Sequence, residues 1–496
     1  MVSGTHPAGT ATGQQAVRRA GPSAGCLLRT EILLALAAFA VLCVAALAAR
    51  PALVEPDDYA YRASTVALAD GYPLTLSTVQ VSALATQLTG PGPLGGVEQW
   101  VQLPGGRWIS EKNPGYPFLA APFQLLGIIR LAPLFYGALA CFGLFVGARR
   151  WIGRYAGGVA VGLFCSSGAA LLFAWRDYMP TFTDASLIAA GTGALLWALL
   201  ADEATARRRT WAGLLGFLAI EAAVFARYTD IVVLGCAVLA VLAVRWRRPA
   251  SVPRGALGWW LGSVVLFGAG VAVWNDLVYG GPLKSGYQPG EITFSLSAIG
   301  PNLRYMPVHL IEAMPMLVLG LVALAWIAVR WVTLRRASPD GPRGERAGAE
   351  QARGQAGEQA GAARRDVAVG LALAASWFGV WALYAAYTWT TVPFLSTLQA
   401  ARFYVPALGA ISLLGAWLVT RLPGRAWLAA VSSAAVVAAM FGLGIWAFND
   451  MRAFPLGVPG IAYRGTGHRT SAGPGRQIGG PPGRRGKPPG GPPASR

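Results

Sequence analysis

The chain has 496 residues, of which 54% are hydrophobic and only 13% are charged, and its mean hydropathy is +0.47. A soluble domain carries about 25% charged residues. Apolar runs of about 18 or more residues recur here, and each is long enough to cross a hydrocarbon core of about 30 Å. These features exclude a soluble protein, and runs of this length exclude a β-barrel, whose strands alternate in segments of about ten residues.

The net charge of +19 comes mostly from arginines in the tails and in the short loops between apolar runs. Lysine and arginine accumulate in the cytoplasmic loops of membrane proteins, and the sequence has no basic soluble domain to hold a duplex. We therefore interpret the charge as a sign of topology and expect no nucleic-acid partner.

The cysteines and histidines give little support for metal or thiol chemistry. The cysteines are odd in number, scattered and mostly inside apolar runs, which argues against a disulfide framework and against a zinc site. Two of the three histidines lie in the tails, so a histidine metal site or a Ser-His-Asp triad has almost nothing to build on. A general base is then a carboxylate. The residues are Cys26, Cys43, Cys141, Cys165 and Cys236, with His6, His309 and His468.

The N-terminal segment, residues 1–28, is polar and rich in Gly and Ala, and it is predicted to be a disordered cytoplasmic tail. The first span covers Ile32–Ala49. Small residues near its end fit a signal-peptide cleavage site, but the polar stretch before it is long for a signal peptide. This favours an uncleaved anchor.

Residues 50–130 are predicted to form a large extracytoplasmic loop after the first span. The loop opens with EPDDYAYRAS, residues 55–64, which places three acids within four positions beside two tyrosines. The stretch PGYPFLAAPFQLLG, residues 114–127, is apolar but too short and too rich in proline to span. We interpret it as an interfacial or re-entrant piece.

Further apolar runs predict an all-α polytopic membrane protein with about eleven transmembrane helices. Arginine-rich loops such as RRWIGR (149–154) and RLPGR (421–425) then fall on the side of the N-terminal arginines, provided that 114–127 does not cross. The N-terminus is therefore predicted to be cytoplasmic and the C-terminus extracytoplasmic. The runs are 131–148, 155–174, 183–200, 211–226, 231–244, 257–274, 313–331, 367–386, 404–420 and 426–447.

Composition divides the rest of the chain. Residues 29–332 form the predicted membrane core, and residues 333–366, rich in Gly, Ala, Gln, Arg and Glu, resemble a flexible cytoplasmic linker. Residues 367–449 form the C-terminal transmembrane helices. Residues 450–496 are rich in Gly, Pro and Arg and are predicted to be a disordered tail.

The loops on the outer side concentrate acids, tyrosines, prolines and single basic residues. Lysine is rare in the chain, yet two of the three lysines, Lys112 and Lys284, lie in these loops. A mixed surface of acids, cations and aromatics at one face of an apolar bundle suits an amphiphilic, anionic substrate. The acids would act on a hydroxyl, and the cations would hold a phosphate.

The adjacent pair Asp57 and Asp58 is the strongest candidate for acid–base chemistry. Like charges raise the pKa of at least one of two neighbouring carboxyls, and we expect this to move it toward general-base strength. A carboxylate can take the proton of an acceptor hydroxyl during glycosyl transfer, whose transition state resembles an oxocarbenium ion. A leaving phosphate needs positive charge opposite it.

Five segments resemble, in chain order, those of the GT-C glycosyltransferases, in the branch of protein O-mannosyltransferases and lipid A aminoarabinose transferases. DDYAY is similar to the acidic motif of the family's first outer loop, and EKNPGYPFLAAPF to the segment that closes that loop. YMPTFTDASL is similar to the second outer loop. WNDLVYGGPLKSGY resembles the recurring Asn…Tyr/Phe-Gly-x-Pro…Gly-Tyr segment, and ARFYVPALGAISLL the opening of a late span. The resemblance covers about residues 32–447 and implies a GT-C-like helical bundle.

This resemblance implies roles for particular residues. Asp57 matches the family's catalytic acid and Asp58 is its neighbour, although the family motif often reads Asp-Glu. Lys112 matches a basic residue near the donor phosphate. Asp184 matches the acid of the second outer loop, and Arg402 the late arginine that can face the lipid phosphate. The other candidates for substrate binding are Tyr116, Lys284 and Tyr287.

The family also implies an activity. It implies an integral enzyme of the plasma or inner membrane, surrounded by membrane lipids, that takes a sugar from a polyprenyl-phosphate carrier. The sugar passes on the extracytoplasmic face to a lipid, glycan or protein hydroxyl, with inversion. No cofactor is required by the pattern, although some members need a divalent cation, which two acids can bind through oxygen. The chain has no large C-terminal soluble domain of the kind that some members use to hold protein acceptors, which leaves the acceptor open.

Each candidate also has a plain structural interpretation. Early acids favour a helix start, so Asp57 and Asp58 fit a solvated helix N-terminus, and long basic side chains near a membrane end fit anchoring. For three other features the structural interpretation is favoured over a functional one: Glu55 as a loop charge, Arg176 with Asp177 as a surface pair, and His309 as structural.

Glu221 is a separate case, because it lies inside the apolar run GFLAIEAAVFAR. An intramembrane acid is a functional hypothesis by default, and it also fits pairing with an arginine such as Arg227 or bonding across helices. A transporter or flippase for a lipid-linked sugar predicts essential polar residues near the bilayer midplane, Glu221 first among them. A non-catalytic envelope assembly protein predicts that no single acid matters. Outer-loop acids outnumber midplane acids, which favours the enzyme.

Overall fold

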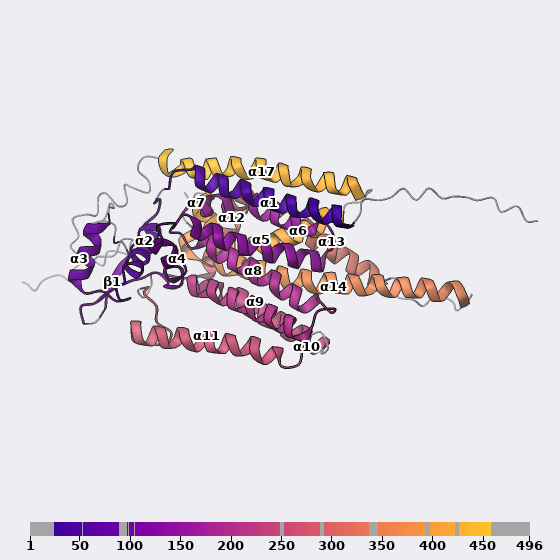
Figure 1. Ribbon diagram of the computed structural model, residues 1–496, viewed down its shortest axis with the longest axis horizontal. Helices are drawn as coiled ribbons and strands as arrows, with labels where there is room; N and C mark the ends of the chain where they lie inside the picture. The colour runs from indigo at the N-terminus through magenta and orange to yellow at the C-terminus, as the bar shows by residue number, and fades with distance from the viewer. Residues whose placement is uncertain are drawn as a thin grey trace, which may run out of the picture.

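The computed structural model describes residues 24–51, 53–88, 97, 99–103, 105–248, 252–287, 292–336, 346–391, 397–421 and 426–457. Helices packed along one common direction form most of the molecule, and a smaller unit with the two strands stands at one end of them (Figure 1). The elements in chain order are α1 Ala24–Ala48, α2 Pro56–Ala69, α3 Thr78–Gln87, β1 Trp100–Gln102, β2 Trp108–Ser110, α4 Gly115–Leu125, α5 Leu131–Trp151, α6 Ala156–Cys165, α7 Gly168–Trp175, α8 Thr181–Leu200, α9 Ala206–Ala226, α10 Ile231–Arg247, α11 Ala256–Tyr279, α12 Ile299–Ala313, α13 Met316–Arg336, α14 Arg346–Ala385, α15 Thr397–Tyr404, α16 Leu408–Thr420 and α17 Ala426–Gly457.

Within the described ranges, ten helices are long and apolar enough to cross a membrane, or eleven if the bent pair α6–α7 counts as one span. The chain is therefore an integral, multi-pass helical membrane protein, as its hydropathy predicts. The expected span 155–174 differs in detail, because it bends by 62° between α6 and α7. The cause lies in its sequence. Ser167 caps the new helix by accepting from the backbone N–H of Ala170, and the Ser166 hydroxyl bonds back to the Leu163 carbonyl.

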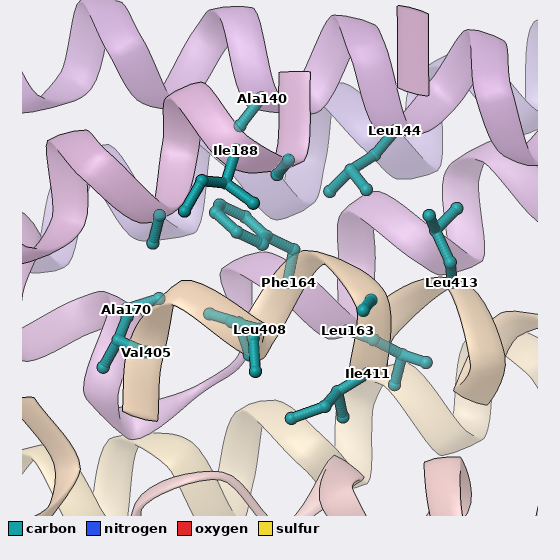
Figure 2. Packing of buried hydrophobic residues seen from close by; sticks show 14 of the residues in the cluster. Ala140, Leu144, Leu163, Phe164, Ala170, Ile188, Val405, Leu408, Ile411 and Leu413 are labelled. Atoms are coloured by element: carbon teal, nitrogen blue, oxygen red, sulfur yellow. The ribbon is translucent and has the colours of Figure 1, made fainter. Parts of the chain in front are cut away.

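Close packing of small residues joins the central helices. On α5, Gly143 and Gly147 face the backbone of α8 at Ala190 and Gly193, where a side chain would collide with main-chain atoms. Without a hydrophobic drive between helices in lipid, such close approach supplies the dispersion contacts that hold a membrane bundle together. α16 is buried along nearly its whole length and packs against α6. Figure 2 shows Leu408 of α16 beside Phe164 and Ile411 beside Leu163, while Leu413 points to the other side of the helix.

The unit at the end of the bundle consists of α2, α3, α4 and the antiparallel pair β1–β2 (Figure 1). It has its own small core, in which Val66, Leu76 and Leu84 are buried. α4 joins this unit to the bundle. Its Gly115 lies against the backbone of Phe225 at the end of α9, where a Cβ atom would come within 2.3 Å of the Phe225 carbonyl carbon, so only glycine fits. The unit therefore places the start of α2 directly on the ends of the membrane helices.

Three expected segments can be compared with these bounds. The interfacial piece at 114–127 contains α4, which has 11 residues and is shorter than a span. Residues 346–366 of the expected linker 333–366 belong to helix α14, which begins at Arg346. In the expected tail 450–496, α17 continues to Gly457, and the remainder lies outside the described residues, as does most of the tail 1–28.

Candidate active site

The acidic stretch forms the N-terminus of α2. Glu55 is the N-cap residue, Pro56 occupies the first turn, and Asp58 completes a capping box. Asp58 Oδ2 accepts the backbone N–H groups of Val54 and Glu55 at 2.8 and 2.9 Å. Asp58 is only 1% exposed. Its hydrogen-bonding capacity is thus taken up in holding the helix start, which separates its role from that of Asp57.

Arg176, which follows α7, is the buried partner of this helix start. Its guanidinium lies 2.6 Å from Asp58 Oδ2 and 3.0 Å from Glu55 Oε2, and its side chain is fully buried. The interpretations of Arg176 with Asp177 as a surface pair and of Glu55 as a loop charge were therefore wrong. Residues 118 positions apart meet here, and no local pattern reveals such a contact.

Asp57 faces the other way and lies between two cations. Its carboxylate is 3.2 Å from Lys112 Nζ and 3.3 Å from Arg402 Nη1. Its side chain keeps 21% exposure, whereas that of Lys112 keeps 8%. Arg402 also pairs with Glu55 at 2.9 Å, and Lys112 with Glu111 at 3.2 Å. The predicted residues Asp57, Lys112 and Arg402 are thus brought together from the outer loop and a late span, with Asp57 as the accessible member.

The charges around Asp57 set its ionisation. Burial opposes the charged form, but the positive charges of Lys112 and Arg402 outweigh it and hold the pKa of Asp57 well below its usual range. For Asp58, burial raises the pKa, while Arg176 acts against that rise. The expectation that repulsion between Asp57 and Asp58 tunes a general base was therefore wrong for Asp57. The two carboxyls face different cations, so these pairings and burial dominate.

Tyr287 completes one side of this group. Lys112 Nζ lies 5.0 Å from the centre of its ring, within cation–π range. Gly286 makes this approach possible, because a Cβ at that position would lie 2.5 Å from the Cα of Glu111. Lys284 is on the same loop but remains exposed at the surface. The loop after α11 therefore brings Tyr287, and not Lys284, to Lys112.

Gly286→Ala is expected to weaken the site without unfolding the protein. The added methyl group must push the loop away from the backbone of Glu111, which moves Tyr287 off Lys112. We expect a loss of about tenfold in any activity that depends on Lys112, since a misplacement of about 1 Å can cost 10²-fold. Gly280→Ala offers no matched control, because Gly280 has φ +74°. Gly258→Ala, in α11 with open space around it, is the appropriate comparison. Equal activity of both variants would show that the loop is not needed.

Asp184 lies behind this group. It is fully buried on α8, and its Oδ2 is 3.5 Å from Arg227 Nη1. Arg227 in turn donates to the backbone carbonyl of Arg402 at 2.8 Å. The predicted residue Asp184 thus reaches the site through Arg227 and the backbone of Arg402, which suits support for Arg402 better than contact with a substrate. Arg227 could have been noticed in the sequence, because it is the single basic residue that ends the apolar run GFLAIEAAVFAR.

Tyr116 is also placed beneath the site. Its fully buried hydroxyl donates to the backbone carbonyl of Asp177, and its ring meets Tyr61 edge to face at 5.7 Å. The side-chain carboxyl of the same residue, Asp177, is also largely buried, and this burial raises its pKa to about 6. Tyr116 therefore joins α4 to α2 and to the segment after α7, and it supports the helix that carries Asp57.

Two other residues considered from the sequence lie in separate surroundings. Glu221 accepts a hydrogen bond from the Ser263 hydroxyl at 2.9 Å, across the contact of α9 with α11. This is the bond across helices, rather than the pair with Arg227. His309 shares Thr397 with Glu312: its Nδ1 is 2.8 Å from the Thr397 hydroxyl, which donates to Glu312 at 2.5 Å.

The acids at the start of α2 do not fit a divalent cation. Glu55, Asp57 and Asp58 each face a lysine or an arginine at 2.6–3.3 Å. Mg²⁺ and Ca²⁺ are bound by carboxylate, carbonyl and water oxygens. Here a metal ion would first have to displace the lysine and arginine side chains that already pair with these carboxylates. Among the described residues, no group of three His, Cys, Asp or Glu side chains is placed to hold a metal.

Comparisons with known proteins found similar solved structures. No protein-family model and no curated protein matches the chain. ArnT from Cupriavidus metallidurans bound to undecaprenyl phosphate has 16% identity and a TM-score of 0.47, over 88% of this chain and 71% of that one. Its apo form has 18% identity and a TM-score of 0.47, over 82% and 63%. The apo oligosaccharyltransferase of Archaeoglobus fulgidus has 12% identity and a TM-score of 0.46, over 93% and 61%. At these identities no residue role is transferred.

Proposed function

We propose that the chain is a membrane glycosyltransferase that takes a sugar from a polyprenyl-phosphate carrier and passes it to a lipid, glycan or protein hydroxyl. One observation carries this proposal: the accessible carboxylate of Asp57 lies between Lys112 and Arg402 at the end of an apolar bundle. The segments that contain these residues are also the ones that resemble GT-C enzymes. An amphiphilic substrate with a phosphate head suits this position, because its chain can lie among apolar helices while its head reaches the cations.

The two cations have the chemistry to hold the donor phosphate. Burial disfavours a charged Lys112, but the carboxylates of Asp57 and Glu111 outweigh it and raise its pKa, so that it carries its proton. Arg402 has a donor to spare, because its buried Nε has no acceptor among the described residues. Phosphate oxygens would accept from both side chains, and the same contacts would stabilise the charge that develops as the carrier phosphate leaves.

Asp57 would then act as the base. The acceptor oxygen attacks the anomeric carbon, its proton passes to the Asp57 carboxylate, and the bond from that carbon to the phosphate oxygen breaks. The electron pair of this bond leaves with the polyprenyl phosphate. A single displacement of this kind inverts the anomeric centre, and the negative charge of Asp57 favours the oxocarbenium-like transition state.

Donor binding would also make Asp57 a stronger base. In the free protein, Lys112 and Arg402 hold its pKa well below the usual range, against the effect of burial. A bound phosphate draws on the same two cations, so less of their charge acts on Asp57, and its pKa rises. A base whose strength appears only when the donor is present would limit idle reaction with water.

The test is consumption of labelled polyprenyl-phosphate sugars by membranes that contain the protein. Undecaprenyl-phosphate sugars come first, since undecaprenyl phosphate is the lipid present in one of the ArnT structures. The expected result is release of the carrier phosphate together with a glycosylated product of opposite anomeric configuration. Translocation of an intact donor, with no cleavage, would contradict the proposal.

Glu221→Gln is expected to leave transfer within about twofold of wild type, because Glu221 bonds to Ser263 across α9 and α11 and shows no contact with Asp57. Retained hydrogen bonding by glutamine keeps the stability change within about 1 kcal/mol. The measurement is donor consumption, paired with a translocation assay in proteoliposomes. Abolished translocation in Glu221→Gln, with harmless changes at Asp57, would favour a flippase.

The same proposal places the protein in the plasma or inner membrane. The arginine-rich loops favour a cytoplasmic N-terminus and an extracytoplasmic C-terminus, which puts the site on the outer face. Residues 29–332 would be the catalytic membrane core and 367–449 the C-terminal helices. Cysteine labelling from either side, at residues in the connections 152–155 and 280–287, tests this orientation.

A further inference from the structure

The aromatic ring of Phe403 contacts two of the cations near the site. Arg402 Cζ lies over this ring at 4.6 Å from its centre, and Arg227 Cζ lies over it at 5.8 Å. Both distances are within the range of about 6 Å in which a cation is attracted to the face of an aromatic ring. Arg227 also donates to the backbone carbonyl of Arg402 at 2.8 Å. One ring therefore contacts both the cation assigned to the donor phosphate and the arginine that supports its backbone.

The Phe403 ring is held in place by two tyrosines. Its centre lies 4.9 Å from the ring centre of Tyr384 and 5.3 Å from that of Tyr387, which meets it edge to face. The Tyr384 hydroxyl forms a hydrogen bond with the Thr229 hydroxyl at 2.6 Å, and this ties Tyr384 to the segment after α9. Tyr384 is itself only 4% exposed. The position of the Phe403 ring is thus set by the packing of the protein and not by a substrate.

This contact holds Arg402 without using its hydrogen-bond donors. A cation–π contact is made with the face of the ring. The acceptors of the guanidinium are the carboxylates of Glu55 at 2.9 Å and Asp57 at 3.3 Å, both through Nη1, while its buried Nε has no acceptor among the described residues. Because a guanidinium carries its five N–H donors in a rigid plane, its orientation decides which of them can meet a phosphate.

We propose that Phe403 is a positioning residue for the donor: it keeps the guanidinium of Arg402 in the orientation that binds the carrier phosphate. The inference rests on the proposed function and adds a residue that acts through Arg402 rather than on the substrate itself. Without the ring, Arg402 is free to turn further onto the two carboxylates at the start of α2. A phosphate would then have to compete with Glu55 and Asp57 for its donors.

Three changes at position 403 separate the attraction between ring and cation from plain packing. Phe403→Leu keeps an apolar side chain without a ring, and Phe403→Tyr keeps the ring. A ring-fluorinated phenylalanine, inserted through an expanded genetic code, keeps nearly the same shape, but its fluorines weaken the negative face that attracts a cation. Phe294→Leu is the matched control, since Phe294 packs against Tyr387 at 5.3 Å and has no cation–π contact among the described residues.

The measurements are binding of undecaprenyl phosphate to the full-length protein and KM for an undecaprenyl-phosphate sugar and for the acceptor. In Phe403→Leu we expect the affinity for undecaprenyl phosphate to fall about threefold to tenfold, in line with the strength of a partly buried cation–π contact. KM for the donor rises by the same factor, whereas KM for the acceptor changes less than about twofold. Phe403→Tyr and Phe294→Leu bind as wild type does, and the fluorinated protein lies between wild type and Phe403→Leu.

Wild-type affinity in the fluorinated protein would overturn the inference, even with weak binding by Phe403→Leu, because the ring would then act through packing alone. An equal loss in Phe294→Leu would overturn it too. Asp57→Asn keeps the two hypotheses apart, since it is expected to bind undecaprenyl phosphate while its transfer falls. If Asp57→Asn is inactive and the variants at 403 behave as wild type, only the role of Phe403 fails. If Asp57→Asn transfers sugar as wild type does, the proposed mechanism fails, and the binding data still decide the role of Phe403.

Discussion

Asp57→Asn is expected to lower the rate of sugar transfer by about 10²- to 10⁴-fold, the range found for loss of a general base. Asparagine has nearly the same shape, but its amide neither takes up a proton nor places negative charge beside the transition state. Lys112 and Arg402 remain next to it. They still hold the phosphate, so KM for the donor is expected to change much less than kcat.

The protein is expected to stay folded, because neither cation loses its last partner. Lys112 keeps Glu111 at 3.2 Å, and Arg402 keeps Glu55 at 2.9 Å. Asp70→Asn is the matched control, since Asp70 is an exposed acid at the other end of α2. Donor consumption, with thermal unfolding in parallel, measures both effects. Transfer by Asp57→Asn at the rate of Asp70→Asn would remove Asp57 from the mechanism.

The helices were predictable because hydropathy and span length are properties of local sequence. The eleven predicted spans correspond to the ten straight candidates and the bent pair α6–α7. The bend itself was missed, although Ser166, Ser167 and Gly168 are its local signal. A serine can cap a new helix, or it can lie inside a continuous helix without breaking it. The packing of neighbouring helices decides which of the two occurs.

The site was predictable to a smaller extent, for reasons that differ between residues. The spacing from Glu55 to Asp58, with Pro56 between them, is a capping-box pattern. The role of Asp58 in holding the helix start could therefore have been predicted from the sequence. The pairing of Asp58 with Arg176 joins residues 118 positions apart, and a single sequence does not contain that information. Phe403 was missed, since only the fold brings a second arginine to its ring.

Arg176→Met is expected to destabilise the protein by about 3–5 kcal/mol, as for other buried pairs that lose one partner. Asp58 is 1% exposed, so it would be left as a buried acid without its cation. Asp57 is the residue just before Asp58 at the start of α2. If this helix start becomes less ordered, the rate of sugar transfer is expected to fall as well. Thermal unfolding of the purified protein in detergent measures the first effect, and donor consumption the second.

A double-mutant cycle distinguishes this pair from a general loss of packing. Asp58→Asn keeps an oxygen that can cap α2, yet it removes the charge, so Arg176→Met should cost much less in that background than in wild type. The coupling energy is expected at the upper end of the range of about 0.5–3 kcal/mol seen for neighbours in one network. Arg304→Met, at an exposed position on α12, should change stability by less than about 0.5 kcal/mol. Additive effects of Arg176→Met and Asp58→Asn would mean that the pair does not hold the helix start, and the placement of Asp57 would then depend on Lys112 and Arg402 alone.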